Sequence, residues 1–244
     1  MIRRAPLTWR VARVRETIEE SPRAKTLVLE VPGWKGHRAG QHLDIRLTAP
    51  DGYQAQRSYS LASAPEDPSS AVTVDRIEDG EVSPYLTEVV EVGDEIEVRG
   101  PIGGPFTWAV ADGGPLLLAG GGSGLVPLMS MLRHRARNAS EIDTRALISV
   151  REPALALYPD ELRSLQPAAN LDVRWTYTRA PAPGPRDFSG RVSAAMLAEL
   201  GPPPDAAPHV FICGPTGFVE AVSNLLVDAG HDPARIRTER FGPS

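Results

Sequence analysis

Polar side chains of several chemical kinds are concentrated in one short stretch of the chain, QRSYSLASAP at residues 56–65. Its composition favours a β-strand, yet a strand with one buried face alternates apolar and polar residues, and this one offers the core only Leu61 and two alanines. Arg57 carries a guanidinium fork that matches a phosphate, Tyr59 a flat apolar ring, and Ser60 a small hydrogen-bonding hydroxyl. The stretch therefore either lines a ligand or forms an exposed edge strand.

A glycine-rich turn could bind phosphate groups through its backbone. In LLLAGGGSGLVPLMSML, residues 116–132, an apolar strand runs into glycines and is followed by a helix with Leu and Met at helical spacing. Amides at the start of a helix can approach a pyrophosphate closely. Pro127 stands where the usual dinucleotide fingerprint has its third glycine, so the match to that fingerprint is incomplete. The glycines concerned are Gly120, Gly121, Gly122 and Gly124.

A lone cysteine lies at the end of another apolar segment. In FICGPTGFVEAV, residues 211–222, Cys213 ends an expected strand, and Gly214 and Pro215 begin the turn that follows. Ligands of a parallel α/β sheet bind beyond the carboxyl ends of its strands, so the thiol is expected to point into the same crevice as the glycine-rich turn. The alternative is a small buried apolar side chain, which is the commoner role of a single cysteine.

Composition and charge exclude several classes of function. The 244 residues carry a net charge of −5 and no basic stripe, which argues against nucleic-acid binding. The most basic stretch, RHRARN at residues 133–138, is interpreted as the solvated side of a helix. One cysteine allows no internal disulfide, and no Cys or His cluster has the spacing of a metal site, so no metal is expected.

The same features suggest a compartment. A single cysteine fits a reducing cytoplasm. The arginine pair at residues 3–4 is not followed by the apolar core of an export signal, and no stretch approaches 18 consecutive apolar residues. We therefore expect a cytoplasmic monomer without a membrane span.

The hydrophobic pattern changes near residue 110. Before it, short alternating segments are separated by Gly and Pro turns, which is typical of a small antiparallel barrel; after it, apolar strands alternate with helices, which implies a doubly wound parallel sheet. Two domains are therefore expected, 1–110 and 111–244. The expected barrel strands include 9–14, 26–31, 42–47, 71–77 and 95–99. The expected strands of the second domain are 115–119, 146–150, 172–177 and 210–213, with helices beginning near 124, 158, 192 and 216.

Taken together, these stretches resemble the ferredoxin-NADP reductase family of flavoproteins along nearly the whole chain. Each motif is modestly specific, whereas their order and spacing together are highly specific. The motifs are RSYS at 57–60, DGEVSPYL at 79–86, GPIGGPF at 100–106, GGGSGLVP at 120–127, LYPDEL at 157–162, FICGP at 211–215 and the terminal ERFGPS. The resemblance implies an N-terminal antiparallel six-stranded flavin-binding barrel, followed by a doubly wound α/β domain that binds NAD(P).

By this resemblance the polar strand lines the flavin. Arg57 pairs with a flavin phosphate, Tyr59 packs on the isoalloxazine, and Ser60 hydrogen-bonds near its reactive N5, with Ser58 beside them. The polar residues then face a cofactor rather than solvent.

The segment DGEVSPYL would hold the other end of the cofactor. After a tight turn at Gly80, amides near Val82 and Ser83 hold the flavin pyrophosphate by the resemblance, which favours FAD over FMN. Ser83 can also cap a helix that begins at Pro84, and an ordinary capped helix would select the same residues. FMN therefore stays open as the alternative cofactor.

The α/β domain would hold the pyridine nucleotide. At the end of its third strand, Thr178 and Arg179 match the pair with which NADP-dependent members hold the 2′-phosphate, which favours NADPH over NADH. Arg151 could add a second charge and Tyr158 a ring over the adenine; alternatively, both arginines are solvated loop residues. The remaining nucleotide-binding residues by this resemblance are Gly121, Gly122, Gly124, Cys213, Gly214 and Pro215.

The resemblance places hydride transfer where the domains meet. Ser60, Cys213 and Glu239 would surround the transfer site, positioning the nicotinamide and stabilising or reprotonating the reduced flavin. Phe241 would cover the flavin ring, although residues 242–244 extend beyond it and could displace it. Glu239 could equally be a surface carboxylate paired with Arg240.

The sequence thus predicts an NAD(P)H-dependent flavoprotein reductase. It would take hydride from NADPH or NADH onto FAD and pass electrons to a separate acceptor, since one cysteine cannot hold an iron-sulfur cluster. The acceptor could be a ferredoxin, an oxygenase component, a quinone or free flavin. A non-catalytic module that binds flavin or nucleotide is the alternative from another class.

Overall fold

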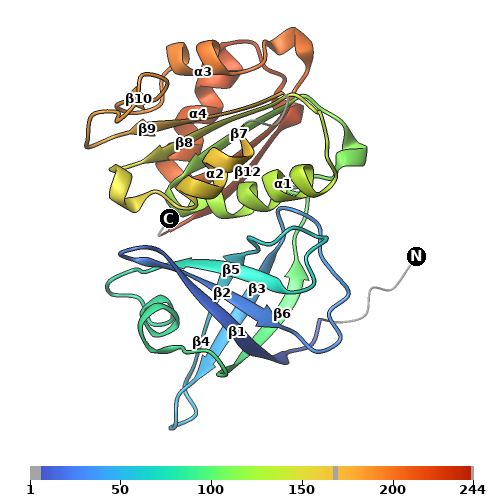
Figure 1. The fold of residues 1–244 in the computed structure, drawn as a ribbon, viewed down its shortest axis with the longest axis vertical. Coiled ribbons are helices and arrows are strands. Elements are labelled where there is room, and N and C mark those ends of the chain that lie inside the picture. The colour runs from blue at the N-terminus through green and yellow to red at the C-terminus, as the bar shows by residue number, and fades with distance from the viewer. Residues whose placement is uncertain (1–6, 167–169, 243–244) are drawn as a thin grey trace.

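The first half of the molecule is a six-stranded antiparallel sheet curled into a barrel (Figure 1). The computed structural model describes residues 7–166 and 170–242. The strand order is β4-β3-β6-β1-β2-β5, and a bridge between Leu61 and Val72 joins the two edges of the sheet. This confirms the antiparallel barrel expected from the sequence. The strands are β1 (Arg10–Ser21), β2 (Ala24–Glu30), β3 (His42–Thr48), β4 (Gln54–Ser60), β5 (Ser70–Asp75) and β6 (Glu95–Ile102).

The barrel core is built from residues two apart, as strand geometry requires. Most strands contribute a pair of side chains to the interior, because alternate residues of a strand point to the same face. β4 differs, since it offers only partly buried Ala55 and Tyr59 to this core. The paired core residues are Ala12 and Val14, Leu27 and Leu29, Leu43 and Ile45, Val72 and Val74, and Ile96 and Val98.

The second half is a six-stranded parallel sheet with helices on both faces (Figure 1). Its order is β10-β9-β8-β7-β11-β12, so the sheet grows in opposite directions from β7 and the switch lies between β7 and β11. The doubly wound sheet predicted from the sequence is confirmed. The strands are β7 (Leu116–Gly121), β8 (Thr144–Val150), β9 (Leu171–Tyr177), β10 (Phe188–Ser189), β11 (His209–Pro215) and β12 (Ile236–Phe241).

Two helices cover each face of this sheet. Leu116 and Leu118 of β7 pack in the cluster that holds α1 and α2, whereas Leu117 and Ala119 pack in the cluster that holds α3 and α4. A strand buried on both faces therefore reads as a continuous apolar run. The helices are α1 (Leu125–Arg137), α2 (Pro159–Leu165), α3 (Ala194–Leu200) and α4 (Thr216–Asp228). The short helical turns are η1 (Tyr85–Val89), η2 (Val110–Asp112), η3 (Gly122–Gly124), η4 (Pro153–Leu155), η5 (Pro204–Ala206) and η6 (Pro233–Arg235).

Two predictions, one about the start of a helix and one about the end of a strand, were wrong. Ser83 does not cap the following helix: its Oγ accepts a hydrogen bond from the amide of Ile77 at 3.0 Å, and the turn η1 has no side-chain cap. Cys213 does not end its strand, because β11 continues to Pro215 in register with β12. In the first case the loop before the turn uses the hydroxyl, and in the second the neighbouring strand extends the pairing.

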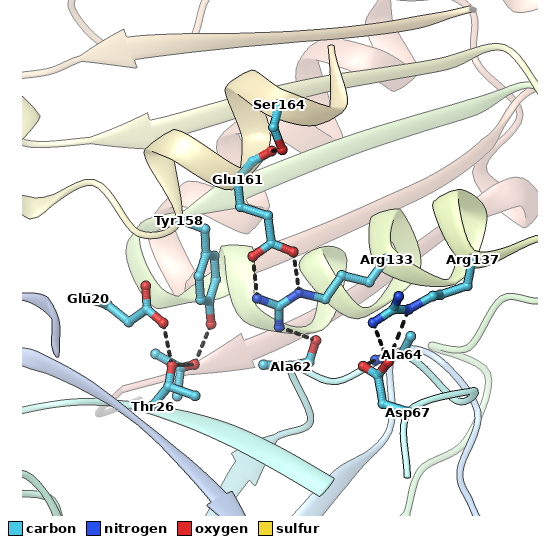
Figure 2. A network of polar contacts seen from close by, with 11 residues as sticks. Glu20, Thr26, Ala62, Ala64, Asp67, Arg133, Arg137, Tyr158, Glu161 and Ser164 are labelled. Carbon is cyan, nitrogen blue, oxygen red and sulfur yellow. Dashed lines mark hydrogen bonds and ion pairs between the residues drawn. The ribbon is translucent and has the colours of Figure 1, made fainter. Parts of the chain in front are cut away.

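The interpretation of RHRARN as a solvated helix side was wrong for residues 133–135, which are buried or partly buried, whereas residues 136–138 are exposed as expected. Arg135 is only 2% exposed and His134 is buried, because this side of α1 faces the barrel and the core rather than water. Arg133 donates from Nε and Nη2 to Glu161 of α2 at 2.8 and 2.6 Å, and from Nη1 to the carbonyl of Ala62 at 2.8 Å (Figure 2). These residues therefore join the two domains.

The segment that follows β4 is held by the part of α1 from Ser130 to Arg137. Ser130 donates to the carbonyl of Ser63 at 2.6 Å, and His134 Nδ1 lies 2.7 Å from Glu66. Arg137 contacts Asp67 at 2.9 Å. The end of the polar strand β4 is thereby fixed to the helix that follows the glycine-rich turn.

A chain of hydroxyl groups crosses the domain boundary beside these ion pairs. The hydroxyl of Tyr158, which is buried, donates to Thr73 Oγ1 of β5. Thr73 in turn lies 2.6 Å from Thr26 Oγ1, which donates to Glu20 at 2.7 Å. The guanidinium of Arg133 lies 4.9 Å from the centre of the Tyr158 ring, within range of a cation–π contact (Figure 2). Polar groups on both sides of the boundary are thus paired rather than solvated.

Replacing Tyr158 by Phe should destabilise the protein without changing its shape. The substitution removes a buried hydroxyl and one partner of Thr73, which costs about 1–3 kcal/mol of the free energy of unfolding. Urea denaturation followed by circular dichroism measures this loss. The control is Tyr85→Phe, because Tyr85 is exposed and its hydroxyl has no hydrogen bond within residues 7–166 and 170–242. Equal stability of the two variants would contradict the role assigned to the buried contact.

Candidate functional site

A cavity of about 230 Å³ opens along the polar strand β4. The resemblance assigned eight residues to the flavin, including Ser60, which it also placed at the transfer site. All eight line this cavity. These are Arg57, Ser58, Tyr59, Ser60, Gly80, Val82, Ser83 and Phe241. Residues that sequence analysis did not assign to this cavity are Thr73, Asp75, Ile77, Glu81, Ser123, Val126 and Gly242.

The polar groups of β4 differ in how far they are satisfied. Ser58 donates to Asp44 at 2.7 Å, and Arg57 donates to Glu81 at 2.7 Å. Among the described residues the hydroxyl of Ser60 has no hydrogen-bond partner. Burial raises the pKa of Tyr59, so its phenol stays neutral. Arg57 and Ser60 are therefore the groups best placed to meet a polar ligand.

Glu81 forms an ion pair with Arg57, the cationic residue of this cavity. Its carboxylate accepts from Arg57 and, at 2.6 Å, from the hydroxyl of Tyr53. The hydrogen bond from Tyr53 and then that from Arg57 lower the pKa of Glu81, so the carboxylate is ionised at neutral pH. A phosphate that bound Arg57 would take the place that this carboxylate now occupies.

A second cavity, of about 640 Å³, lies between the barrel and the carboxyl ends of the parallel strands. Gly121, Gly122, Arg151, Thr178 and Pro215 line it, as does Phe241. The lining residues that sequence reasoning did not assign include four from the barrel, Ser21, Arg23, Ala24 and Asp75, and from the second domain Ser123, Arg191, Val192 and Phe218. For Arg191, the sequence offered one signal, its position directly after Gly190 at the end of the Pro-rich loop. Nothing in the sequence marked Arg23 as a cavity residue.

The glycines of the turn have separate jobs. Gly122 has φ +57°, in the left-handed region that favours glycine, and lines the larger cavity. Gly124 lies outside that lining: a Cβ there would come within 2.0 Å of the carbonyl oxygen of Cys213. Gly124 therefore lets the start of α1 pack directly on β11.

Six of the predicted site residues line neither cavity: Gly124, Tyr158, Arg179, Cys213, Gly214 and Glu239. Tyr158 is 3% exposed in the domain boundary, so it cannot cover an adenine as the resemblance implied. Cys213 is 2% exposed inside β11, where it packs in the core cluster that also holds α1. Arg179 is exposed and Gly214 buried, and neither lines a cavity. The position of these residues in the sequence did not reveal how their side chains pack in the folded protein.

Glu239 lies beside Cys213, to which it is opposite in the parallel pairing of β11 and β12. Burial raises the pKa of Glu239 to about 7. Burial, and then the charge of Glu239, raises the pKa of the Cys213 thiol, so that thiol is protonated at neutral pH. Arg240 donates to Thr238 at 3.1 Å, and in the described part of the chain it makes no ion pair with Glu239.

The two cavities share a wall. Asp75, Ser123 and Phe241 line both of them. Phe241 is 37% exposed, and it belongs to the last strand of the second domain, whereas Asp75 ends β5 of the barrel. Two ligands bound in these cavities would meet at this wall, which suits a transfer reaction between them.

The part of the chain that the structure describes holds neither a metal-binding cluster nor a membrane-spanning helix. Within residues 7–166 and 170–242, no group of three His, Cys, Asp or Glu side chains could hold a metal ion. None of the helices in those same ranges has the length and hydropathy needed to span a bilayer.

Comparison with known proteins identifies the family. Residues 11–107 match the oxidoreductase FAD-binding domain, and residues 118–224 match the oxidoreductase NAD-binding domain. The two domains in this order are typical of the ferredoxin-NADP reductase family, and the chain belongs to that family. The family assignment made from the motifs is confirmed.

Relatives with curated descriptions are longer than this chain. The glycine betaine monooxygenase reductase subunit of Chromohalobacter salexigens is 34% identical over 212 residues, covering 84% of this chain and 56% of that protein. A flavohemoprotein of Giardia intestinalis is 29% identical, covering 96% of this chain and 62% of that protein. The chain therefore spans about 56–62% of the length of these two relatives.

Solved structures share the whole arrangement of two domains. The FAD/NAD-binding domain of nitric oxide dioxygenase from Vibrio cholerae has a TM-score of 0.85 at 28% identity, covering 96% of this chain and 99% of that one. A cytochrome P450 reductase from Amycolatopsis has a TM-score of 0.84 at 26% identity, covering 98% of this chain and 71% of that one.

Proposed function

We propose that the chain is a reductase that moves hydride from NADPH or NADH to bound FAD and then passes electrons to a separate acceptor. The observation that carries this proposal is the wall of Asp75, Ser123 and Phe241, because it brings the ends of the two cavities together. When bound, the flavin accepts two electrons as hydride and can release them singly or in pairs. The same proposal includes the domain boundaries: residues 1–110 form the barrel domain and residues 111–244 the α/β domain.

The residues of the smaller cavity fit a flavin dinucleotide. Arg57 would exchange Glu81 for a phosphate, the ring of Tyr59 would support the isoalloxazine, and the unpartnered hydroxyl of Ser60 would hydrogen-bond near N5. The loop with Gly80, Val82 and Ser83 would hold the pyrophosphate, which FMN lacks. FAD is therefore the proposed cofactor, and FMN the alternative.

The acceptor is proposed to be a separate molecule, either a protein or a small molecule. Two relatives are described as reductases of partner enzymes, one of a glycine betaine monooxygenase and one of a cytochrome P450. A ferredoxin, an oxygenase component, or a small quinone or flavin would all suit a two-electron donor of this kind. One cysteine in the sequence also suits a reducing compartment such as the cytoplasm.

Anaerobic reduction tests the proposal against a non-catalytic binding module. The protein is loaded with FAD, freed of excess, and mixed with NADPH without oxygen. Loss of the yellow flavin absorbance supports a reductase. Failure to retain flavin, or a bound flavin that NADPH leaves oxidised, would contradict it.

Arg57→Ala should lose flavin before it loses the fold. Truncating one partner of a charge pair with phosphate weakens binding by about 2–5 kcal/mol, and the lower end applies because Arg57 is exposed. The measurement is the flavin-to-protein absorbance ratio after dialysis. Arg76→Ala is a matched control, since Arg76 pairs with Glu88 and lines neither cavity. Full retention of flavin by Arg57→Ala would refute the phosphate contact.

Glu239 should make flavin reduction depend on pH near neutrality. Its carboxyl is neutral below a pKa of about 7 and negative above it. A negative charge beside the transfer site opposes the arrival of hydride, so the rate constant of reduction is expected to fall severalfold as pH rises through 7. Glu239→Gln stays neutral and should keep the low-pH rate from pH 6 to 8. A pH profile that is the same in the variant would remove Glu239 from the transfer site.

The preferred nucleotide is proposed to be NADPH. Arg151 and Arg191 line the larger cavity, and neither side chain has an ion pair or hydrogen bond among the residues described. Arg179 is also unpaired there but lies outside the lining, and Glu152 beside Arg151 partly offsets the positive field. Unpaired guanidinium groups in a ligand cavity suit the 2′-phosphate, which NADH lacks.

Charge removal should therefore lower the preference for NADPH. A charge-assisted phosphate contact contributes about 1.5–3 kcal/mol, so Arg151→Gln and Arg191→Gln should each reduce the ratio of kcat/KM for NADPH and NADH by about tenfold. Arg179→Gln should have a smaller effect, because this side chain does not line the cavity. A wild type that favours NADH, or unchanged ratios in the variants, would rule out the proposed preference.

A further inference from the structure

The wall of the larger cavity that belongs to the barrel carries a charged pair. Arg23, in the turn between β1 and β2, donates from Nε to Asp75 at 2.7 Å and from Nη2 to the carbonyl of Arg76. Both side chains are about one-third exposed, at 36% and 32%, and both line the cavity. The pair is therefore part of the cavity surface rather than of the outer surface alone.

Much of the hydrogen-bonding capacity of Arg23 remains unused. A guanidinium offers five N–H donors, and the contacts to Asp75 and Arg76 use two of them. Nη1 has no partner within residues 7–166 and 170–242. Asp75 and the Arg76 carbonyl thus hold the fork in place while part of it is left for another acceptor.

The charge of the cavity selects an anion. Three arginines, Arg23, Arg151 and Arg191, line it, and Asp75 is the only carboxylate in its described lining. The whole chain, in contrast, carries a net charge of −5. A positive cavity in an acidic protein concentrates anionic ligands.

The position of Arg23 indicates which part of a dinucleotide it meets. Its partner Asp75 also lines the smaller cavity, whereas Arg151 and Arg191 line only the larger one. Under the proposed function the nicotinamide must lie at the shared wall, so Arg23 is near the nicotinamide half and the other two arginines are near the adenosine half. The anionic group between these two halves is the pyrophosphate.

We propose that Arg23 of the barrel binds the pyrophosphate of the pyridine dinucleotide, with Asp75 as the residue that positions its guanidinium. The inference rests on the proposed function. It makes the nucleotide site a product of both domains: the barrel binds the part common to NADH and NADPH, and the α/β domain binds the part that distinguishes them.

The test compares three ligands on the FAD-loaded full chain. Titration calorimetry gives dissociation constants for NADP⁺, NAD⁺ and 2′-AMP, which lacks a pyrophosphate. Arg23→Gln should weaken NADP⁺ and NAD⁺ by the same factor, on the order of tenfold for one charge-assisted contact, and leave 2′-AMP unchanged. The control Arg15→Gln, at an exposed arginine of β1 that pairs with Glu30 and lines neither cavity, should change none of the three.

The outcomes separate this inference from the proposed function. A wild type that binds neither dinucleotide overturns both. If the wild type binds both dinucleotides, two results overturn the role of Arg23 alone. Either Arg23→Gln leaves both dissociation constants unchanged, or it raises the dissociation constant of 2′-AMP by the same factor as those of the dinucleotides. Should Arg23→Gln fail to fold, Arg23→Lys keeps the charge without the fork; it should weaken both dinucleotides by a smaller equal factor, and unchanged constants there overturn the inference.

Discussion

The arrangement of the whole molecule depends on a polar contact that is buried between two domains. The hydroxyl of Tyr158 reaches Thr73 of the barrel, and the guanidinium of Arg133 connects Glu161 of α2 with the carbonyl of Ala62. Because buried polar groups are costly when unpaired, these contacts favour one relative position of the domains over others that would leave them unsatisfied. Two cavities on different domains can share a wall only if that position is kept.

The shared wall explains why both domains are needed for the proposed chemistry. Phe241 belongs to β12, the last strand of the α/β domain, and Asp75 ends β5, an edge strand of the barrel sheet. Each of these two residues lines both cavities. The helix α1 connects this wall to the rest of the site, since it begins at the glycine-rich turn and its side chains hold the segment that follows β4. Flavin-side and nucleotide-side residues are therefore positioned by the same helix.

The sequence predicted the fold and much of the cavity lining. The lack of alternation in QRSYSLASAP correctly marked a strand whose polar side chains line a cavity, because no core would accept them. The apolar strand before the glycines correctly marked a strand of the parallel sheet. Such local patterns are readable, since strand and helix periodicity are set by the backbone.

Contacts between domains could not be predicted in the same way. RHRARN has the composition of a solvated helix side, but His134 lies against Glu66 of the barrel and Arg135 is buried, donating to the carbonyl of Ile142. Tyr158 lies in the motif LYPDEL just before α2, where the resemblance implied a ring over the adenine, but its hydroxyl donates to Thr73 of the other domain. Arg23 lies in an ordinary turn, and the cavity that it lines exists only when both domains are in place.

The most direct test of this account loosens the domain contact and leaves both cavities intact. Arg133→Met removes the guanidinium that donates across the boundary to the carbonyl of Ala62, and Arg133 lies outside both linings. Stopped-flow measurement of flavin reduction by saturating NADPH, together with dissociation constants for FAD and NADP⁺, separates positioning from binding. The account predicts a reduction rate constant lower by about tenfold, with both dissociation constants nearly unchanged, because small displacements of reacting groups are costly. An unchanged rate constant would contradict the claim that this contact sets the distance between the two ligands.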